Sequence, residues 1–437
     1  MRDLAIAAVL LWFVLSAFRK PWIGILGWTW VSIMNPHALS WQLQSLPVAA
    51  AVGGSTLVGL FVAKTGKEFF LCRENATLML FMLWMTIVLP FSMIFDASYP
   101  LWNRVMKIDL MILVAMVLLH SKRHLILLVW TLVISIGFYG VKGGLFTLAT
   151  GGSYRVWGPT NTYIEGNNEV ALAIVVTIPL MRFLQMQMKN RKAQLIMSGC
   201  MISMALAALG SHSRGALLAI LAMGTVLWWR GKNRLVGAIG FIVVGLALLS
   251  IMPAEWWNRM DTIKDYKEDD SAMGRINAWW MAFNLAKSNF FGGGFHIYEA
   301  GIFAAYAPNP NDVHAAHSIY FMVLGELGFI GLGIFLTLFL YTWGTAGKAF
   351  KEGRKQPQTQ WVSDLGGMIQ VSLVGFAVGG AFLSLSYWDL PYNLMILAVG
   401  ASRWLNGKRW LTEPDGPLVP LPAFIADRFR RRPVPRL

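Results

Sequence analysis

The feature that most constrains this chain is a series of long apolar runs separated by short charged linkers. Runs of about 17 to 25 residues, the length that a helix needs to cross a hydrocarbon layer of about 30 Å, recur along most of the sequence. Only 14% of the 437 residues are charged, whereas soluble domains carry about 25%. Since backbone groups in lipid are satisfied only within helices or closed barrels, the sequence predicts an all-α polytopic membrane protein.

The number and length of the runs predict about twelve transmembrane helices. The apolar segments fall near residues 4–34, 45–63, 77–95, 100–120, 125–149, 169–187, 195–210, 215–229, 235–251, 317–343, 366–385 and 391–404. The first is interrupted at Arg19-Lys20-Pro21; we prefer one proline-broken crossing, retained as an anchor, to two short helices.

The same pattern divides the chain into four parts. These are a helical bundle at 1–251, a large polar loop at 252–316, further transmembrane helices at 317–404 and a basic, proline-rich tail at 405–437. Lysine and arginine cluster in every second linker, which is typical of cytoplasmic loops. The remaining linkers, including 150–168, 211–214 and 252–316, are therefore expected on the opposite side.

The net charge of +15 is accounted for by those cytoplasmic clusters and the tail, so nucleic-acid binding is not predicted. The two cysteines, Cys72 and Cys200, offer neither a disulfide framework nor metal-ligand spacing.

Four arginines are predicted on the non-cytoplasmic side, where positively charged residues are uncommon. Arg214 follows a very short turn and begins the next helix, where the helix dipole is already positive. A guanidinium there is unfavourable unless an anion binds it, although snorkelling to headgroups is the alternative. We predict anion binding by Arg214 and Arg275, with Arg155 as a secondary candidate. Arg259 lies in an acidic run, which favours a solvated ion-paired surface.

Five of the seven histidines also fall on that side: His37 in the neutral linker 35–44, and His212, His296, His314 and His317 later in the chain. His317 stands where the chain enters an apolar helix, which favours it as a general base, with His314 as a secondary candidate. His314 and His317 would share a helical face and could begin a metal site, but no carboxylate lies at a matching offset, so no metal is predicted.

Two further patterns occur in the polar loop. Residues 274–289 read as a helix with an apolar side that could lie in the membrane interface. The run Gly292-Gly293-Gly294 could cradle phosphate, but no lysine or helix follows it, so we interpret it as a turn.

Several of these residues resemble the motifs of one family. His317-Ser318, nine residues, and then Gly328-Phe329-Ile330-Gly331 resembles the signature of bacterial O-antigen ligases, within the wider ligase and polymerase superfamily. Gly274-Arg275, Trp279 and Phe291 to Phe295 are similar to the stretch that precedes this histidine. Ser213-Arg214-Gly215 resembles the family's other arginine position.

The resemblance implies a glycosyltransferase of lipopolysaccharide biosynthesis in the bacterial inner membrane, with its active site facing the periplasm. Its donor would be a glycan on undecaprenyl diphosphate and its acceptor a sugar hydroxyl of lipid A core. His317 would be the base, and Arg214 and Arg275 would bind the diphosphate. No cofactor is expected, because the first outer linker, 35–44, contains no carboxylate to hold a metal.

Three alternatives remain open at this stage. An O-antigen polymerase would use the same donor with another carrier-linked glycan as acceptor, and a protein O-oligosaccharyltransferase would glycosylate serine or threonine. A transporter of lipid-linked glycan is disfavoured, because transporters place charges near the bilayer midplane and show repeats.

Overall fold

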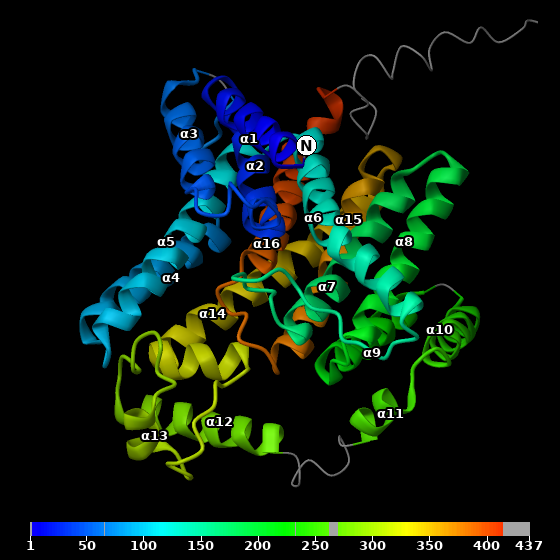
Figure 1. Ribbon diagram of the computed structural model, residues 1–437. Helices are drawn as coiled ribbons and strands as arrows, with labels where there is room; N and C mark the ends of the chain where they lie inside the picture. Colours follow the sequence, from blue (N-terminus) through cyan, green and yellow to red (C-terminus); the bar gives the residue numbers. More distant parts are fainter. Residues whose placement is uncertain (1, 65, 232, 262–269, 414–437) are drawn as a thin grey trace, which may run out of the picture.

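A computed structural model describes residues 2–64, 66–231, 233–261 and 270–413 (Figure 1). All regular elements in these ranges are helical. The α-helices are α1 (Arg2–Arg19), α2 (Pro21–Met34), α3 (Val48–Val62), α4 (Arg73–Val88), α5 (Phe95–Leu118), α6 (Lys122–Ala149), α7 (Asn167–Gln187), α8 (Arg191–Gly210), α9 (Arg214–Arg230), α10 (Arg234–Leu249), α11 (Ala254–Asp261), α12 (Asp270–Ser288), α13 (Ala300–Tyr306), α14 (Ile319–Glu352), α15 (Gln360–Gly380) and α16 (Asp389–Asn406).

The all-α prediction is confirmed for the described residues, and the chain is a multi-pass membrane protein. Six described helices are long and apolar enough to cross a membrane, or seven if the bent pair α10 and α11 forms one span. Every apolar segment expected from the sequence overlaps a helix. The count of twelve is not confirmed, because α2 and α3 are short and α5 carries four charged side chains. It stays a prediction.

Residues 4–34 do not form one proline-broken crossing, so that preference was wrong. The chain reverses between Arg19 and Pro21, and α1 and α2 pack side by side as an antiparallel pair. The rings of Phe13 and Trp30 lie 5.8 Å apart, and Phe13 also covers Gly27. Proline at the first position of α2 favours this arrangement, because it starts a helix readily but cannot continue the one before it.

The helices of the large polar loop lie at one end of the bundle, below it in Figure 1, with α12 beside α13 and α11 apart from them. The N–H of Met93 donates to the carbonyl of Gly293 at 2.9 Å, and the hydroxyl of Ser98 donates to the carbonyl of Phe295 at 2.7 Å. Which end faces the periplasm stays a prediction.

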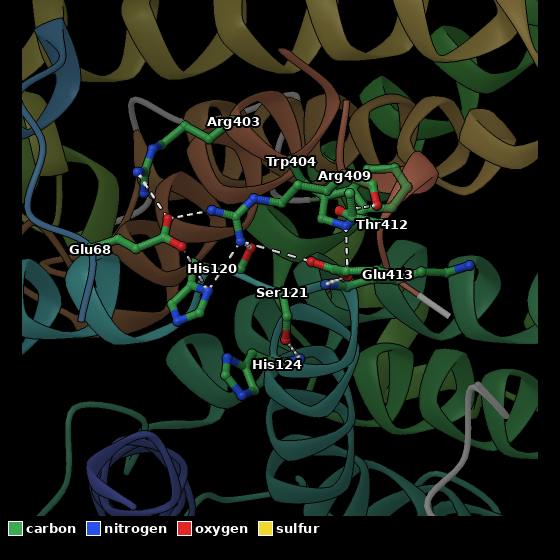
Figure 2. A network of polar contacts seen from close by, with 10 residues as sticks. Glu68, His120, Ser121, His124, Arg403, Trp404, Arg409, Thr412 and Glu413 are labelled. Atoms are coloured by element: carbon green, nitrogen blue, oxygen red, sulfur yellow. Dashed lines mark hydrogen bonds and ion pairs between the residues drawn. The ribbon is translucent and has the colours of Figure 1, made fainter. Parts of the chain in front are cut away.

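At the opposite end a polar network fastens the last described residues to the bundle (Figure 2). The Glu68 carboxylate accepts from Arg409 and, at 3.3 Å, from Arg403. The Glu413 carboxylate accepts from the Trp404 indole at 2.8 Å. Residues 405–413 of the predicted tail are thus held in place, whereas its basic, proline-rich stretch, residues 414–437, lies outside the described residues.

Helix α14 breaks at Gly328, whose backbone has φ 70° and ψ −174°. The break frees carbonyl groups of the preceding turn, and other segments supply donors to them. Gly293 and Gly294 donate their N–H groups to Gly325 and Glu326 at 2.9 Å. The Trp84 indole donates to Leu327 at 2.9 Å. The sequence predicted an uninterrupted helix here, which is wrong because the polar loop replaces the missing helical hydrogen bonds.

Candidate active site

Three arginines meet at a cavity at the end of the bundle that carries the polar loop. The cavity is small and opens to solvent at its mouth. Its lining comes from the starts of α7 and α9, from α11 and α12, and from the turn after α15: Asn168, Ser213, Arg214, Gly215, Arg259, Arg275, Phe382 and Leu383. The two arginines singled out for anion binding therefore lie together, and Arg259 joins them.

The turn that presents Arg214 is held from several sides. The Asn167 amide donates to the carbonyl of Ser211 at 2.7 Å, and Nε2 of His212 lies 2.8 Å from the carbonyl of Gly152. The Ser213 hydroxyl caps α9 by accepting from the N–H of Ala216 at 3.2 Å. The position of the Arg214 backbone is thus fixed by a buried, hydrogen-bonded turn.

Arg259 reaches the cavity from α11. Its Nε donates to the carbonyl of His212 at 3.3 Å, and the neighbouring Trp256 is buried and donates to the carbonyl of Leu209 at 2.9 Å. The ion pairing expected for Arg259 stays a prediction, and the structure adds that α11 folds back onto the turn before α9, so that Arg259 lines the cavity. The acidic residues 265, 268 and 269 of that run lie outside the described residues.

Helix α12, which confirms the helix predicted at 274–289, clamps the segment that carries the two histidines. The Asn277 amide donates to the carbonyls of Asn309 and Asp312 at 2.8 and 2.9 Å. The Trp279 indole donates to the carbonyl of Ala316 at 2.7 Å, and its ring stacks on Phe321 at 5.1 Å. Helix α12 therefore carries Arg275 and also fixes the position of Ala316, the residue before His317.

His317 has the properties of a neutral base next to the arginines. Its backbone is in the left-handed region, with φ 41°, a strained conformation for a non-glycine residue that is enriched at functional sites. Its Nδ1 is buried and has no hydrogen-bond partner among the described residues. Burial, and then the charges of Arg275 and His314, lower the pKa of His317 to about 4. The imidazole is therefore unprotonated at neutral pH.

His314 plays a different part from His317. Its Nδ1 lies 2.7 Å from the Asp312 carboxylate, and its side chain is 43% exposed. Gly274 allows the ring to approach α12, since a Cβ there would lie 2.7 Å from Nδ1. Among the residues that the structure describes, no three His, Cys, Asp or Glu side chains come close enough to hold a metal ion; metal independence stays a prediction.

Two other sequence candidates do not reach the cavity. Arg155 is exposed in the linker after α6 and is absent from the cavity lining. The N–H groups of Gly293 and Gly294 are used at the break in α14, so the glycine run is a turn, as preferred, and does not offer those groups to phosphate.

The sequence reasoning missed Asn168 and Glu169. Asn168 lines the cavity, and Glu169 interacts electrostatically with Arg275. A signal was present, because Asn167-Asn168-Glu169 is a polar triplet at the very start of an apolar run. Polar residues are common at the start of a helix, so the triplet alone did not indicate a functional site.

Two family models match this chain. Residues 199–336 match the model described as O-antigen ligase. These residues form an O-antigen ligase family domain. Residues 1–189 match a family of unknown function, DUF5935. A search of curated proteins found no match.

The O-antigen ligase family domain contains all three cavity arginines, His317 and the break at Gly328. Asn168 comes from the region that matches the family of unknown function, and Phe382 and Leu383 lie beyond both regions. The family consists of membrane ligases and polymerases of O-antigen, so a glycosyl-transfer activity is supported at the level of the superfamily.

Proposed function

We propose that this protein transfers a glycan from undecaprenyl diphosphate to a sugar hydroxyl of lipid A core. Arg214 and Arg275 bind the diphosphate, and Arg259 is added to them as a third cation. His317 is the general base. The reaction takes place at the end of the bundle that carries the polar loop, which we assign to the periplasmic face of the bacterial inner membrane.

The observation that carries this proposal is the meeting of three arginines in one small cavity, with His317 beside Arg275. Three guanidinium groups at one cavity give it a positive potential that favours an anionic ligand. Guanidinium groups bind phosphate oxygens through paired, charge-assisted hydrogen bonds, and they do so most strongly where water is excluded. A diphosphate is an anion of the kind that guanidinium groups bind.

The chemistry follows from these roles. The acceptor hydroxyl attacks the anomeric carbon while its proton passes to His317. The bond from that carbon to the diphosphate oxygen breaks, and both electrons leave with the diphosphate. The arginines stabilise the charge that develops on the leaving group. A single displacement of this kind inverts the configuration at the anomeric carbon.

The low pKa of His317 suits this role in one respect. At neutral pH the imidazole is already unprotonated and can accept a proton at once. The arginine that lowers its proton affinity is also the one proposed to bind the diphosphate. Binding of the anion would offset that charge and make His317 more basic once the donor is in place.

The test is transfer by the purified full chain in detergent, with a radiolabelled undecaprenyl diphosphate glycan as donor. Lipid A core, a periplasmic protein and a second carrier-linked glycan are offered separately as acceptors. We expect label on lipid A core. Label only on protein or only on lengthened carrier glycan would make the protein an oligosaccharyltransferase or a polymerase. No transfer from an intact donor by the folded protein would contradict the proposal.

A further inference from the structure

Glu326 is an acidic side chain buried inside the helical bundle. It lies in the first half of α14, two residues before the break at Gly328, and is 1% exposed. Within the described part of the chain, a hydroxyl and a backbone N–H hold its carboxylate, rather than a cation. Burying a carboxyl group is costly, so packing alone does not account for a glutamate at this position.

Two segments from outside α14 meet at the Glu326 carboxylate. The Tyr387 hydroxyl, in the turn between α15 and α16, donates to it at 2.6 Å. The backbone N–H of His296, in the polar loop, also interacts with it. The rings of Phe295 and Tyr387 lie edge to face, with their centres 5.5 Å apart. Glu326 thus joins the polar loop and the turn after α15 to the first half of α14.

The turn after α15 also holds the chain just after His317. The Ser386 hydroxyl is completely buried and donates to the carbonyl of Ile319 at 3.0 Å. Since Ser386 and Tyr387 are adjacent, the hydrogen bond that Tyr387 donates to Glu326 restrains this contact as well. The start of α14 is therefore fixed from the side of α15.

The polar loop holds the chain just before His317. Tyr298 follows His296 by two residues, and its hydroxyl interacts with the backbone of Ala316. His317 itself has a left-handed backbone, with φ 41°, a conformation that persists only where the surrounding structure fixes it. Glu326 therefore supports a strained residue from both sides.

We propose that Glu326 is a positioning residue for His317, acting through Tyr387 on one side and through the backbone of His296 on the other. The inference rests on the function proposed above, in which His317 is the general base. Both groups that meet the carboxylate are hydrogen-bond donors, so the position requires a side chain that only accepts. A glutamine of the same shape would turn its N–H₂ group towards one donor and loosen that side.

The main test is a double-mutant cycle for glycan transfer by the purified full chain. Glu326→Gln should lower kcat by about 10- to 10²-fold, as expected when a catalytic group is misplaced, and leave the KM for the donor unchanged. In a chain that already carries His317→Ala, the same substitution should not lower the residual rate further, because the group that it displaces is gone. A further loss of equal size would reveal a general structural effect and overturn the inference.

Glu74→Gln is the matched control. Glu74 is another buried carboxylate bound to α14, but it accepts from Thr345, towards the other end of that helix. Its substitution should leave kcat unchanged. Tyr387→Phe provides a second variant if Glu326→Gln does not fold, and it should lower kcat in the same way. Unchanged kcat in both of these variants, or an equal loss in Glu74→Gln, would overturn the inference.

A measurement that does not need the reaction separates this inference from the proposed function. Diethyl pyrocarbonate acylates accessible, unprotonated imidazoles, and peptide mass spectrometry measures its rate of reaction with His317, with the 43% exposed His314 as internal reference. We expect faster labelling of His317 in Glu326→Gln than in the wild type or in Glu74→Gln. If the wild type transfers glycan to no acceptor but the labelling changes in this way, the proposed function fails and the placement of His317 by Glu326 stands. Equal labelling in all of these proteins would overturn the inference.

Discussion

Gly292 and Gly328 lie so close together that neither can carry a side chain. A Cβ on Gly292 would lie 2.6 Å from the backbone nitrogen of Gly328, and a Cβ on Gly328 would lie 2.6 Å from the carbonyl oxygen of Phe290. The two positions are 36 residues apart in the sequence, yet they form one joint. This joint sets the direction of the first half of α14, which begins just after His317.

Gly328→Ala should destabilise the protein. The backbone there has φ 70° and ψ −174°, a region that is open almost only to glycine, and forcing another residue into it costs about 1–3 kcal/mol. Thermal unfolding in detergent should show a lower Tm. The control is Gly333→Ala in the same helix, where an added Cβ meets nothing within 4 Å. Equal Tm values for the two variants would contradict the role of the joint.

His317→Ala should lower kcat by about 10²- to 10⁴-fold, the usual contribution of a general base. Binding of the donor should be retained, because the arginines remain. Rapid-mix transfer assays and donor binding by filtration measure the two quantities separately. The matched control is His314→Ala, whose imidazole is paired with Asp312 and whose loss should cost far less. Comparable losses in the two variants would remove the special role of His317.

Arg275→Lys should lower kcat/KM by roughly tenfold or more, since an ammonium group retains the charge but lacks the planar pair of donors. Arg155→Lys is the matched control, because Arg155 is exposed and outside the cavity; its activity should equal that of the wild type. Initial rates over a range of donor concentrations test both. An unchanged rate in Arg275→Lys would place Arg275 outside the site.

The acid limb of the pH profile should lie near the pKa of His317. Burial and then the charges of Arg275 and His314 lower the pKa of His317 to about 4, compared with about 6.5 for an unperturbed histidine. The base form is present above that pKa, so kcat/KM should be constant at neutral pH and fall only as the pH drops through about 4. In Arg275→Gln, the residual activity should begin to fall at a higher pH. An acid limb that does not move would contradict the coupling.

Trp279→Phe should lower kcat while leaving the fold intact. The substitution keeps an aromatic ring against Phe321 but removes the indole donor to the carbonyl of Ala316, next to His317. Misplacing a catalytic group by a small distance costs up to about 10²-fold. Trp280→Phe is the control, because Trp280 is 52% exposed. Transfer rates and Tm of both variants distinguish a positioning effect from a loss of stability.

The general class of fold and part of the site were accessible from the sequence. The length of the apolar runs predicted the helices. Arg214 and Arg275 stood out because positive charge is uncommon in non-cytoplasmic linkers, and the structure places both at one cavity. Arg259 was not accessible, because its place depends on how α11 folds back onto the turn at His212. Asn168 and Glu169 were missed for a similar reason. A polar helix start is common, and only the packing of α7 beside α9 and α12 places it at the cavity.

The break in α14 was hidden because Gly328 lies within an apolar run that continues on both sides. Its non-helical backbone is stabilised by hydrogen-bond donors from Gly293, Gly294 and Trp84, which are distant in the sequence. A local pattern cannot report such partners. The hairpin of α1 and α2 was misjudged because proline in an apolar run fits either a kink or a new helix start.

The origin of the cavity lining also bears on how this protein can change. The segment with the family's motif, residues 199–336, carries the arginines, but Asn168 precedes it and Phe382 follows it. Grafting that segment alone into another helical scaffold would transfer the charges without the surfaces that confine them. The cavity is therefore a product of three parts of the chain, the segment with the arginines and the segments before and after it.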